Sequence, residues 1–287
     1  MKIGVSGGSG KLGRTVLDEL AKRADGHTIV GISRSPGTIP VPFEGRRGDY
    51  DEPASLAAAY KGLDRLLLIP SADLRPGVRG GQVIAAIDAA KQAGVSHVVL
   101  MSAAGTREAP NSELGGTYWA GEQHLIKTAP HWTILRMNYY AESMAEEIQM
   151  SLGMKMLTGL GEERVAYVSR DDLAAATAGV LVGDGHAGAI YNGTGPAIVG
   201  GPEKAAIVSE VLGKPLSYAV ITEEQLRSGL SQAGLPPFVI DAVAEIKRTF
   251  VRGYFDILTS DIERLSGRAP NSFRDVVRAT LSKGGTQ

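Results

Sequence analysis

Residues 3 to 13 read Ile-Gly-Val-Ser-Gly-Gly-Ser-Gly-Lys-Leu-Gly, a short apolar strand that runs into the spacing Gly7-x-x-Gly10-x-x-Gly13. Gly7 allows a sharp turn out of the strand, Gly10 lets backbone amides approach a pyrophosphate, and Gly13 lets the following helix pack closely on the sheet. A helix that begins near Lys11 offers free N–H groups and the positive end of its dipole to an anionic phosphate. The stretch therefore predicts a dinucleotide-binding loop.

The sequence around this loop has the pattern that such a loop requires. Lys2–Ser6 reads as a strand, apolar residues recur at helical spacing from Leu12 to Leu20, and Thr28–Ser33 supplies a second strand. A strand, a glycine turn, a helix and a second strand form one half of a nucleotide-binding unit.

The end of the second strand indicates which dinucleotide binds. NAD-binding chains usually place Asp or Glu about 20 residues beyond the glycines, where the carboxylate accepts hydrogen bonds from the ribose. This chain has Gly31-Ile32-Ser33-Arg34-Ser35, without a carboxylate. Arg34 can make forked, charge-assisted hydrogen bonds to a 2′-phosphate, which favours NADP(H) over NAD(H). The alternative is that Arg34 is a solvated loop residue.

Composition excludes several classes of function. The 287 residues include 30 Lys and Arg, 31 Asp and Glu and no cysteine. Balanced charge without long runs of one sign gives no indication of a nucleic-acid groove or a membrane patch. Disulfides and thiolate chemistry are excluded, and the five histidines lack the paired spacing of a metal site, so we expect no metal. No apolar run approaches the ~20 residues that span a bilayer, and no secretion signal precedes the first strand, so we expect a cytoplasmic protein.

Strand and helix patterns alternate over the first half of the chain. Leu56–Tyr60, Val83–Ala93 and Glu122–Lys127 read as helices, whereas Arg65–Ile69, His97–Ser102 and Trp132–Arg136 read as buried strands. From about Gly153 glycine-punctuated short elements take over, followed by a largely helical Thr222–Arg252. We predict an α/β fold: a Rossmann-type doubly wound parallel sheet in residues 1–152 and a smaller α+β substrate-binding lobe in residues 153–287, some segments of which return to the sheet.

Several further motifs together resemble one family. They are the loop itself with two residues between its first glycines, Gly48-Asp49-Tyr50, Leu66-Leu67-Leu68-Ile69, Ala89-Ala90-Lys91-Gln92-Ala93-Gly94-Val95, Thr133-Ile134-Leu135-Arg136, Val168-Ser169-Arg170-Asp171-Asp172-Leu173-Ala174, Gly188-x-x-Tyr191-Asn192 and Gly267-Arg268-Ala269-Pro270. In order and spacing they resemble the NmrA-like atypical short-chain dehydrogenases, and within them the bacterial NADPH-dependent quinone oxidoreductases and triphenylmethane-dye reductases.

The resemblance implies a set of cofactor-binding residues. The pyrophosphate would lie on Gly7, Gly8, Ser9, Gly10, Lys11 and Leu12, and the 2′-phosphate on Arg34. The cofactor would then pass the strand ends at Pro70, Ser71 and Ala72 and at Ser102 and Ala103. Its nicotinamide would lie beside Asn138, Tyr139 and Tyr140, with a further contact from Arg170. Tyr139 and Tyr140 would also face the substrate, or else simply pack on the sheet. The family often has Asn directly after Leu-Arg, whereas this chain has Met137 there and Asn138 one step later.

The proton chemistry of most short-chain dehydrogenases uses Tyr-x-x-x-Lys, where the lysine charge favours loss of the tyrosine proton. The nearest match here is Tyr118-Trp119-Ala120-Gly121-Glu122. A carboxylate one helical turn away disfavours the phenolate, so Tyr118 is a poor candidate for alcohol–ketone catalysis, and we assign no catalytic residue. Reduction of a quinone or a conjugated dye needs no strong acid, because the charge that arrives with hydride is delocalised.

The sequence thus favours an NADPH-dependent reductase of a quinone or a similar conjugated, planar acceptor, whose partner is a small aromatic molecule. Two alternatives stay open: a non-catalytic, NADP(H)-responsive redox sensor, and a reductase of another aromatic substrate. The oligomeric state is left open. Asp171-Asp172 resembles a metal pair only superficially, and we expect these carboxylates to cap the helix Leu173–Val182.

Overall fold

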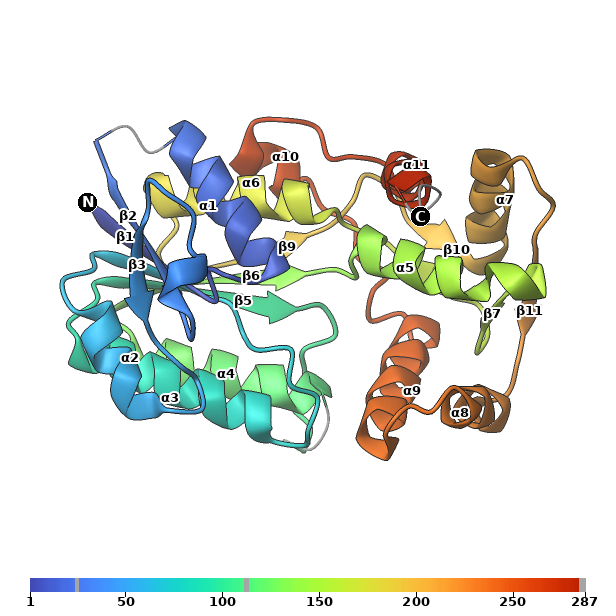
Figure 1. Cartoon of the computed structure of the whole chain (residues 1–287), viewed down its shortest axis with the longest axis horizontal. Helices are drawn as coiled ribbons and strands as arrows, with labels where there is room; N and C mark the ends of the chain where they lie inside the picture. Colours follow the sequence, from blue (N-terminus) through green and yellow to red (C-terminus); the bar gives the residue numbers. More distant parts are fainter. Residues whose placement is uncertain (24–25, 111–113, 284–287) are drawn as a thin grey trace.

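The computed structural model describes residues 1–23, 26–110 and 114–283. A seven-stranded sheet runs through the larger lobe in the order β3-β2-β1-β4-β5-β6-β9, and all its pairings are parallel (Figure 1). Its strands are β1 (Lys2–Ser6), β2 (Thr28–Ser33), β3 (Glu44–Arg47), β4 (Arg65–Leu68), β5 (His97–Ala103), β6 (His131–Met137) and β9 (Ala189–Gly193). The predicted Rossmann-type doubly wound fold is confirmed.

Helices cover both faces of this sheet (Figure 1). One face carries α1 (Lys11–Arg23), α6 (Arg170–Val182) and α10 (Asp261–Ser266); the other carries α2 (Pro53–Tyr60), α3 (Val78–Gln92) and α4 (Leu114–Thr128). Helices α3 and α4 begin several residues before the predicted starts at Val83 and Glu122. Glycines that precede these predicted starts hide the helical pattern but let the two helices approach: a Cβ on Gly80 would lie 3.5 Å from Thr117, and one on Gly121 would lie 2.9 Å from Val83.

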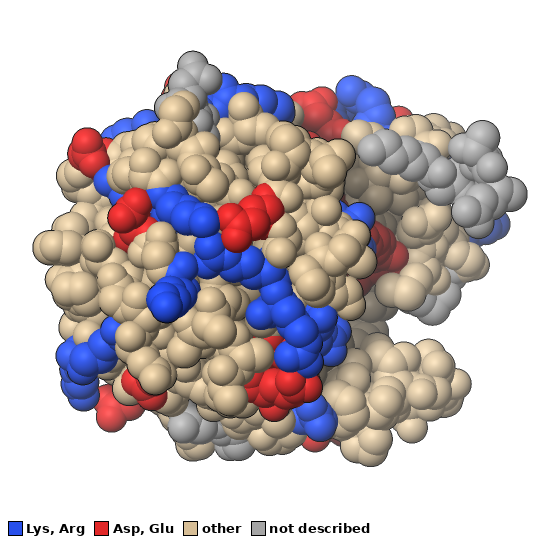
Figure 2. All heavy atoms as spheres, turned by 60° about the vertical axis from the view of Figure 1, so that its left-hand side comes forward, with Lys and Arg blue, Asp and Glu red and all other residues tan. Residues whose placement is uncertain are grey.

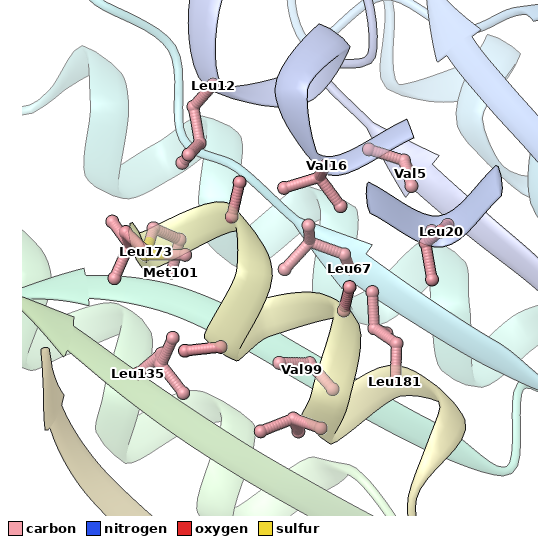
Figure 3. Packing of buried hydrophobic residues seen from close by; sticks show 14 of the residues in the cluster. Val5, Leu12, Val16, Leu20, Leu67, Val99, Met101, Leu135, Leu173 and Leu181 are labelled. Carbon is pink, nitrogen blue, oxygen red and sulfur yellow. The ribbon is translucent and has the colours of Figure 1, made fainter. Parts of the chain in front are cut away.

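The second half of the chain completes the first lobe. Strand β9 pairs with β6, with Tyr191 opposite Leu135. Helix α6 packs on the sheet beside α1, as Figure 3 shows: Leu173 and Leu181 of α6 lie with Leu12, Val16 and Leu20 of α1 over the strand residues Val5, Leu67, Val99, Met101 and Leu135. Helix α6 and strand β9 therefore belong to the larger lobe, although they follow the predicted boundary at residue 152.

The smaller lobe combines helices with two short sheets. Its helices are α5 (Ala141–Ser151), α7 (Gly201–Leu212), α8 (Glu223–Gln232), α9 (Pro237–Val251) and α11 (Phe273–Lys283). Strand β7 (Met156–Gly159) pairs in parallel with β11 (Ser217–Val220), and β8 (Arg164–Val165) pairs antiparallel with β10 (Val199–Gly200). Two short 3₁₀-helices, η1 (Pro36–Thr38) and η2 (Leu152–Met154), complete the described elements. Within these residues no helix combines the length and apolar character needed to cross a bilayer.

Candidate functional site

The glycine loop follows β1 at the carboxyl edge of the sheet. Gly7 has a φ of +87°, and the amides of Gly7 and Gly8 both donate to the carbonyl of Ile32, at 3.1 and 3.0 Å. A Cβ on Gly13 would lie 2.2 Å from the carbonyl oxygen of Gly7, so the helix can pack here only with glycine. A Cβ on Gly10 would meet only that same oxygen, at 3.3 Å, so the outer side of Gly10 is open. The loop has the shape expected of a phosphate cradle.

The loop also offers hydrogen-bond donors. Over the ranges that the structure describes, the amides of Lys11 and Leu12 in the first turn of α1 donate to no acceptor. The side chain of Lys11 instead reaches α5, where its Nζ lies 2.9 Å from Glu146. Both side chains are well exposed, so this ion pair is weak and leaves the lysine able to turn toward an anion.

Arg34 lies next to this loop, directly after β2. Ser33 Oγ donates to Ser9 Oγ at 2.8 Å and accepts from the amide of Ser35 at 3.1 Å, which ties the glycine loop to the end of β2. The side chain of Arg34 is exposed and makes no ion pair with any other described residue. It differs in this from Arg47, opposite Ser33 on β3, whose Nη2 lies 2.8 Å from Glu52. On the face of the larger lobe that Figure 2 presents, basic and acidic side chains lie next to one another.

The ends of β4 and β5 lie along the same edge. Pro70 and Ser71 are half-buried and Ala72 is exposed, and Ser71 Oγ donates to Gln82. Ser102 is fully buried and donates to Glu122 Oε1 at 2.5 Å. Ala103 is therefore the residue that the end of β5 presents to the outside, whereas the hydroxyl of Ser102 is engaged inside the fold.

The buried carboxylate of Glu122 also forms an ion pair with Arg136, at 2.6 Å. This pairing holds the pKa of Arg136 above its usual value, because the hydrogen-bonded carboxylate stabilises the cation. Glu122 thus links α4 to β5 through Ser102 and to β6 through Arg136. It does not contact the hydroxyl of Tyr118.

Asn138 and Tyr139, which follow β6, are directed into the smaller lobe. Asn138 Nδ2 donates to the carbonyl of Phe255 at 3.1 Å, and its Oδ1 accepts from the amide of Tyr139 at 2.7 Å. The Tyr139 ring packs edge-on against Phe250, and its hydroxyl donates to Glu147. Burial raises the pKa of Tyr139 well above its usual value, and the Glu147 carboxylate adds to this. Both predicted contact residues therefore already have partners within the protein.

Tyr140 is placed differently. In the described part of the chain its hydroxyl has no hydrogen-bond partner, and the Arg170 guanidinium lies 5.0 Å from the centre of its ring. Burial raises the pKa of Tyr140, and the neighbouring Tyr118 adds to the shift. Arg170 Nη2 donates to Ser143 at 3.0 Å, and its amide donates to Glu142 at 2.9 Å. Of the segment after β6, Tyr140 is thus the residue whose hydroxyl is available to a ligand.

The predicted cap of α6 needs a correction. Asp171 and Asp172 lie in the first turn of the helix, where carboxylates are favoured. The capping side chain, however, is Ser169, whose Oγ accepts from the amide of Asp172 at 3.0 Å. Asp172 is fully buried and accepts from the amide and the Nδ2 of Asn271, which joins α6 to the segment before α11.

A cleft separates the carboxyl edge of the sheet from α9 of the smaller lobe. One cavity of about 230 Å³ is lined by the segment after β4, by α4, by α8 and by α9, and includes Arg79. A second cavity of about 40 Å³ is lined by Ala103, Tyr118 and Phe255, among others. The two cavities share Leu114 and Glu245 in their walls, so they belong to one cleft.

Two residues of this cleft were not found by sequence reasoning. Glu245 of α9 accepts from the amides of Leu114 and Gly115, at 2.9 and 3.4 Å, and so caps α4 across the two lobes. Arg79 of α3 is buried, and its Nη1 donates to the hydroxyl of Tyr118 at 3.0 Å. Tyr118 therefore contacts a cation, whereas the sequence predicted an unfavourable carboxylate.

The described residues hold no cluster of three or more side chains that could bind a metal ion. His97, the most buried histidine, shares a 2.8 Å hydrogen bond with Thr133 Oγ1. Burial and the nearby Arg65 lower its pKa to about 4. It is a neutral core residue near pH 7.

The chain is similar to several proteins of known function. A sequence profile of the family described as NAD(P)H-binding matches residues 7–183. An NAD(P)H azoreductase of Xenophilus azovorans is 29% identical over 238 residues, which cover 81% of this chain and 80% of the relative.

Two solved structures superimpose over almost the whole chain. The NADPH-dependent quinone oxidoreductase of Escherichia coli complexed with NADPH has a TM-score of 0.90 at 27% identity, covering 97% of this chain and 99% of the other. The triphenylmethane reductase of Citrobacter sp. complexed with NADP(H) has a TM-score of 0.88 at 26% identity, covering 98% of this chain and 100% of the other.

Proposed function

Because the chain belongs to the NAD(P)H-binding family, we propose that it is an NADPH-dependent reductase that transfers a hydride to a quinone or a similar conjugated, planar acceptor. The coarser statement, an NAD(P)H-dependent oxidoreductase related to quinone and dye reductases, follows from the similar proteins. The finer one rests on one arrangement: a phosphate cradle after β1 and a partly aromatic cleft after β5 lie along the same edge of the sheet. In this proposal the partner is a small aromatic molecule and the compartment is the cytoplasm.

The residues of this edge fit an extended dinucleotide. The amides of Lys11 and Leu12 and the guanidinium of Arg34, which have no partner among the described residues, would bind the pyrophosphate and the 2′-phosphate, respectively. The backbone from Pro70 to Ala72 and the exposed side of Ala103 would border the remainder of the cofactor. Tyr140, held by Arg170, would border the nicotinamide. When bound, the cofactor supplies the hydride.

The cleft fits a small acceptor. Its larger cavity, of about 230 Å³, is below the roughly 300–1,000 Å³ of pockets that hold drug-sized ligands, which favours an acceptor of one or two rings. Tyr118 and Phe255 line the smaller cavity, where their rings would border the edge of a flat acceptor held in the cleft. The rate would come mainly from holding that ring against the nicotinamide with water excluded.

Stopped-flow measurement of NADPH absorbance tests the proposal, with benzoquinones, naphthoquinones, azo and triphenylmethane dyes and simple ketones as acceptors. We expect NADPH oxidation with quinones or dyes and little with ketones. Tyr140→Ala should lower turnover by disturbing the ring contacts, whereas Tyr254→Phe, outside the residues that line the two cavities, serves as a control. Tight NADPH binding without oxidation by any acceptor would refute the reductase and favour a redox sensor.

A further inference from the structure

Arg79 is a buried cation in the wall of the larger cavity. It belongs to the first turn of α3, and only 7% of its surface is exposed. Nη1 of its guanidinium donates to the hydroxyl of Tyr118 at 3.0 Å, and Nε is buried without a hydrogen-bond partner. Nη2 makes no hydrogen bond to a described residue but is not fully buried, so it reaches the cavity that Arg79 lines. Arg79 thus keeps a donor that a molecule in the cleft can approach.

The carboxylates of the same cavity are engaged elsewhere. They belong to Asp73, Asp241 and Glu245. Asp73 accepts from Arg75, Asp241 accepts from Arg227, and Glu245 accepts from the first amides of α4. Hydrogen bonds from Arg75 lower the pKa of Asp73 to about 2, and the charge of Arg79 adds only a minor effect. None of these carboxylates therefore neutralises Arg79 by direct contact.

The other buried cations of the protein are paired. Besides Arg79, the described residues include two buried basic side chains, Lys204 and Lys247. Lys204 lies 2.8 Å from Glu163, and Lys247 lies 2.6 Å from Glu147. Burying a charge is costly unless an opposite charge compensates it. Arg79 alone among the three lacks that compensation within the part of the chain that the structure describes, which points to a negative group supplied by a ligand.

The start of α3 offers further attraction for such a group. Pro76 and Gly77, which precede the helix, line the cavity together with Arg79. The amides of Arg79 and Gly80 in its first turn donate to no acceptor among the described residues, and the positive end of the helix dipole favours an anion. The side chains of Leu74, Leu114 and Phe238 add apolar surface to the same cavity. The cavity thus combines a place for a negative charge with walls that suit a ring.

We propose that the acceptor reduced in this cleft carries an anionic substituent, a carboxylate, sulfonate or phosphate, and that Arg79 is the specificity-determining residue that binds it. The inference rests on the proposed function and names the chemical class of its acceptor. The anionic group supplies the charge that Arg79 lacks, while the ring lies against the apolar walls. A cationic acceptor is disfavoured, because it would bring a second positive charge to a buried one.

Kinetics with matched quinones test the proposal. The acceptors are 1,4-naphthoquinone-2-sulfonate, the neutral 2-methyl-1,4-naphthoquinone and a naphthoquinone that carries a trimethylammonium group. Each is assayed with the wild type, Arg79→Met, Arg79→Lys and a control, Arg164→Met, which removes the same charge from an exposed arginine that is paired with Asp256 and lines neither cavity. Comparing each quinone with itself across the variants cancels differences in reduction potential.

A binding measurement accompanies the kinetics and needs neither turnover nor a variant. Naphthalene-2-sulfonate and its uncharged analogue, naphthalene-2-sulfonamide, are titrated calorimetrically into the wild-type complex with NADP⁺. The same titrations of Arg79→Met, together with its Kd for NADPH, show whether the anion site belongs to the acceptor or to the cofactor.

We expect Arg79→Met to lower kcat/KM for the anionic quinone, relative to the neutral one, by about ten- to hundredfold, as for a lost hydrogen bond to a charged group. Arg79→Lys should retain part of the preference because it keeps the charge, and Arg164→Met should behave as wild type. The wild type should bind the sulfonate about tenfold or more tightly than the sulfonamide.

The contrary results separate the two proposals. An equal loss with all three quinones in Arg79→Met, equal binding of sulfonate and sulfonamide, or a matching loss of NADPH affinity overturns the anion site of the acceptor while the reductase stands. A wild-type protein that binds the sulfonate through Arg79 but reduces no quinone or dye overturns the proposed function instead.

Discussion

Replacing Arg34 with Ala should weaken NADPH binding without affecting NADH. The side chain is exposed and unpaired among the described residues, so its removal breaks no contact of the fold, and the melting temperature should stay the same. A forked contact to a phosphate contributes about 1.5–3 kcal/mol, and exposure to solvent puts the expected loss near the lower end. About 1.5–2 kcal/mol corresponds to a roughly ten- to thirtyfold rise in the Kd for NADPH.

Isothermal titration of both cofactors at two salt concentrations measures this effect. The preference for NADPH should decrease with salt in the wild type and should be small at either concentration in Arg34→Ala. Arg47→Ala is the matched control, because Arg47 ends the neighbouring strand but is already paired with Glu52. If the wild type binds NADPH and NADH equally, or if Arg34→Ala keeps the full preference, Arg34 does not bind a 2′-phosphate.

Three further changes have defined outcomes. Gly10→Val should abolish NADPH binding and preserve the circular dichroism spectrum, because its Cβ meets only the Gly7 carbonyl, at 3.3 Å; normal binding would place the dinucleotide elsewhere. Glu245→Gln should lower the free energy of unfolding by about 0.3–1 kcal/mol and raise the KM for the acceptor, since α4 loses an anionic cap; identical melts and KM values would contradict this. His97, with its pKa lowered to about 4, takes up a proton mainly in the unfolded state between pH 6.5 and 4. Stability should therefore fall by up to about 3 kcal/mol on acidification through that window, and denaturant titrations of His97→Gln should show a smaller fall.

The features that sequence predicted well are those encoded by neighbouring residues. The glycine loop, the apolar strands and the amphipathic α1 each arise from a local pattern, and each lies where it was expected. Strand β3 was missed because Glu44-Gly45-Arg46-Arg47 has no apolar alternation, as befits an edge strand.

The features that sequence could not predict depend on distant residues. Arg79 and Tyr118 are 39 positions apart, and Glu245 reaches the start of α4 from 131 positions away. The local spacing predicted Glu122 as the neighbour of Tyr118. In the folded protein that carboxylate instead accepts a hydrogen bond from Ser102 and forms an ion pair with Arg136. Tyr139 and Tyr140 are adjacent in sequence, but the tertiary packing directs the hydroxyl of Tyr139 to Glu147 and leaves the hydroxyl of Tyr140 without a partner among the described residues.

The late return of α6 and β9 to the sheet matters for how the protein is made. As the nascent chain leaves the ribosome, the part of α1 that packs against α6 stays uncovered until α6 has been synthesised. The sheet lacks its last strand until residue 193. The larger lobe therefore cannot finish folding as an independent N-terminal unit during translation. It closes only after the chain has passed through α5 and β7 of the smaller lobe, so the two lobes mature together.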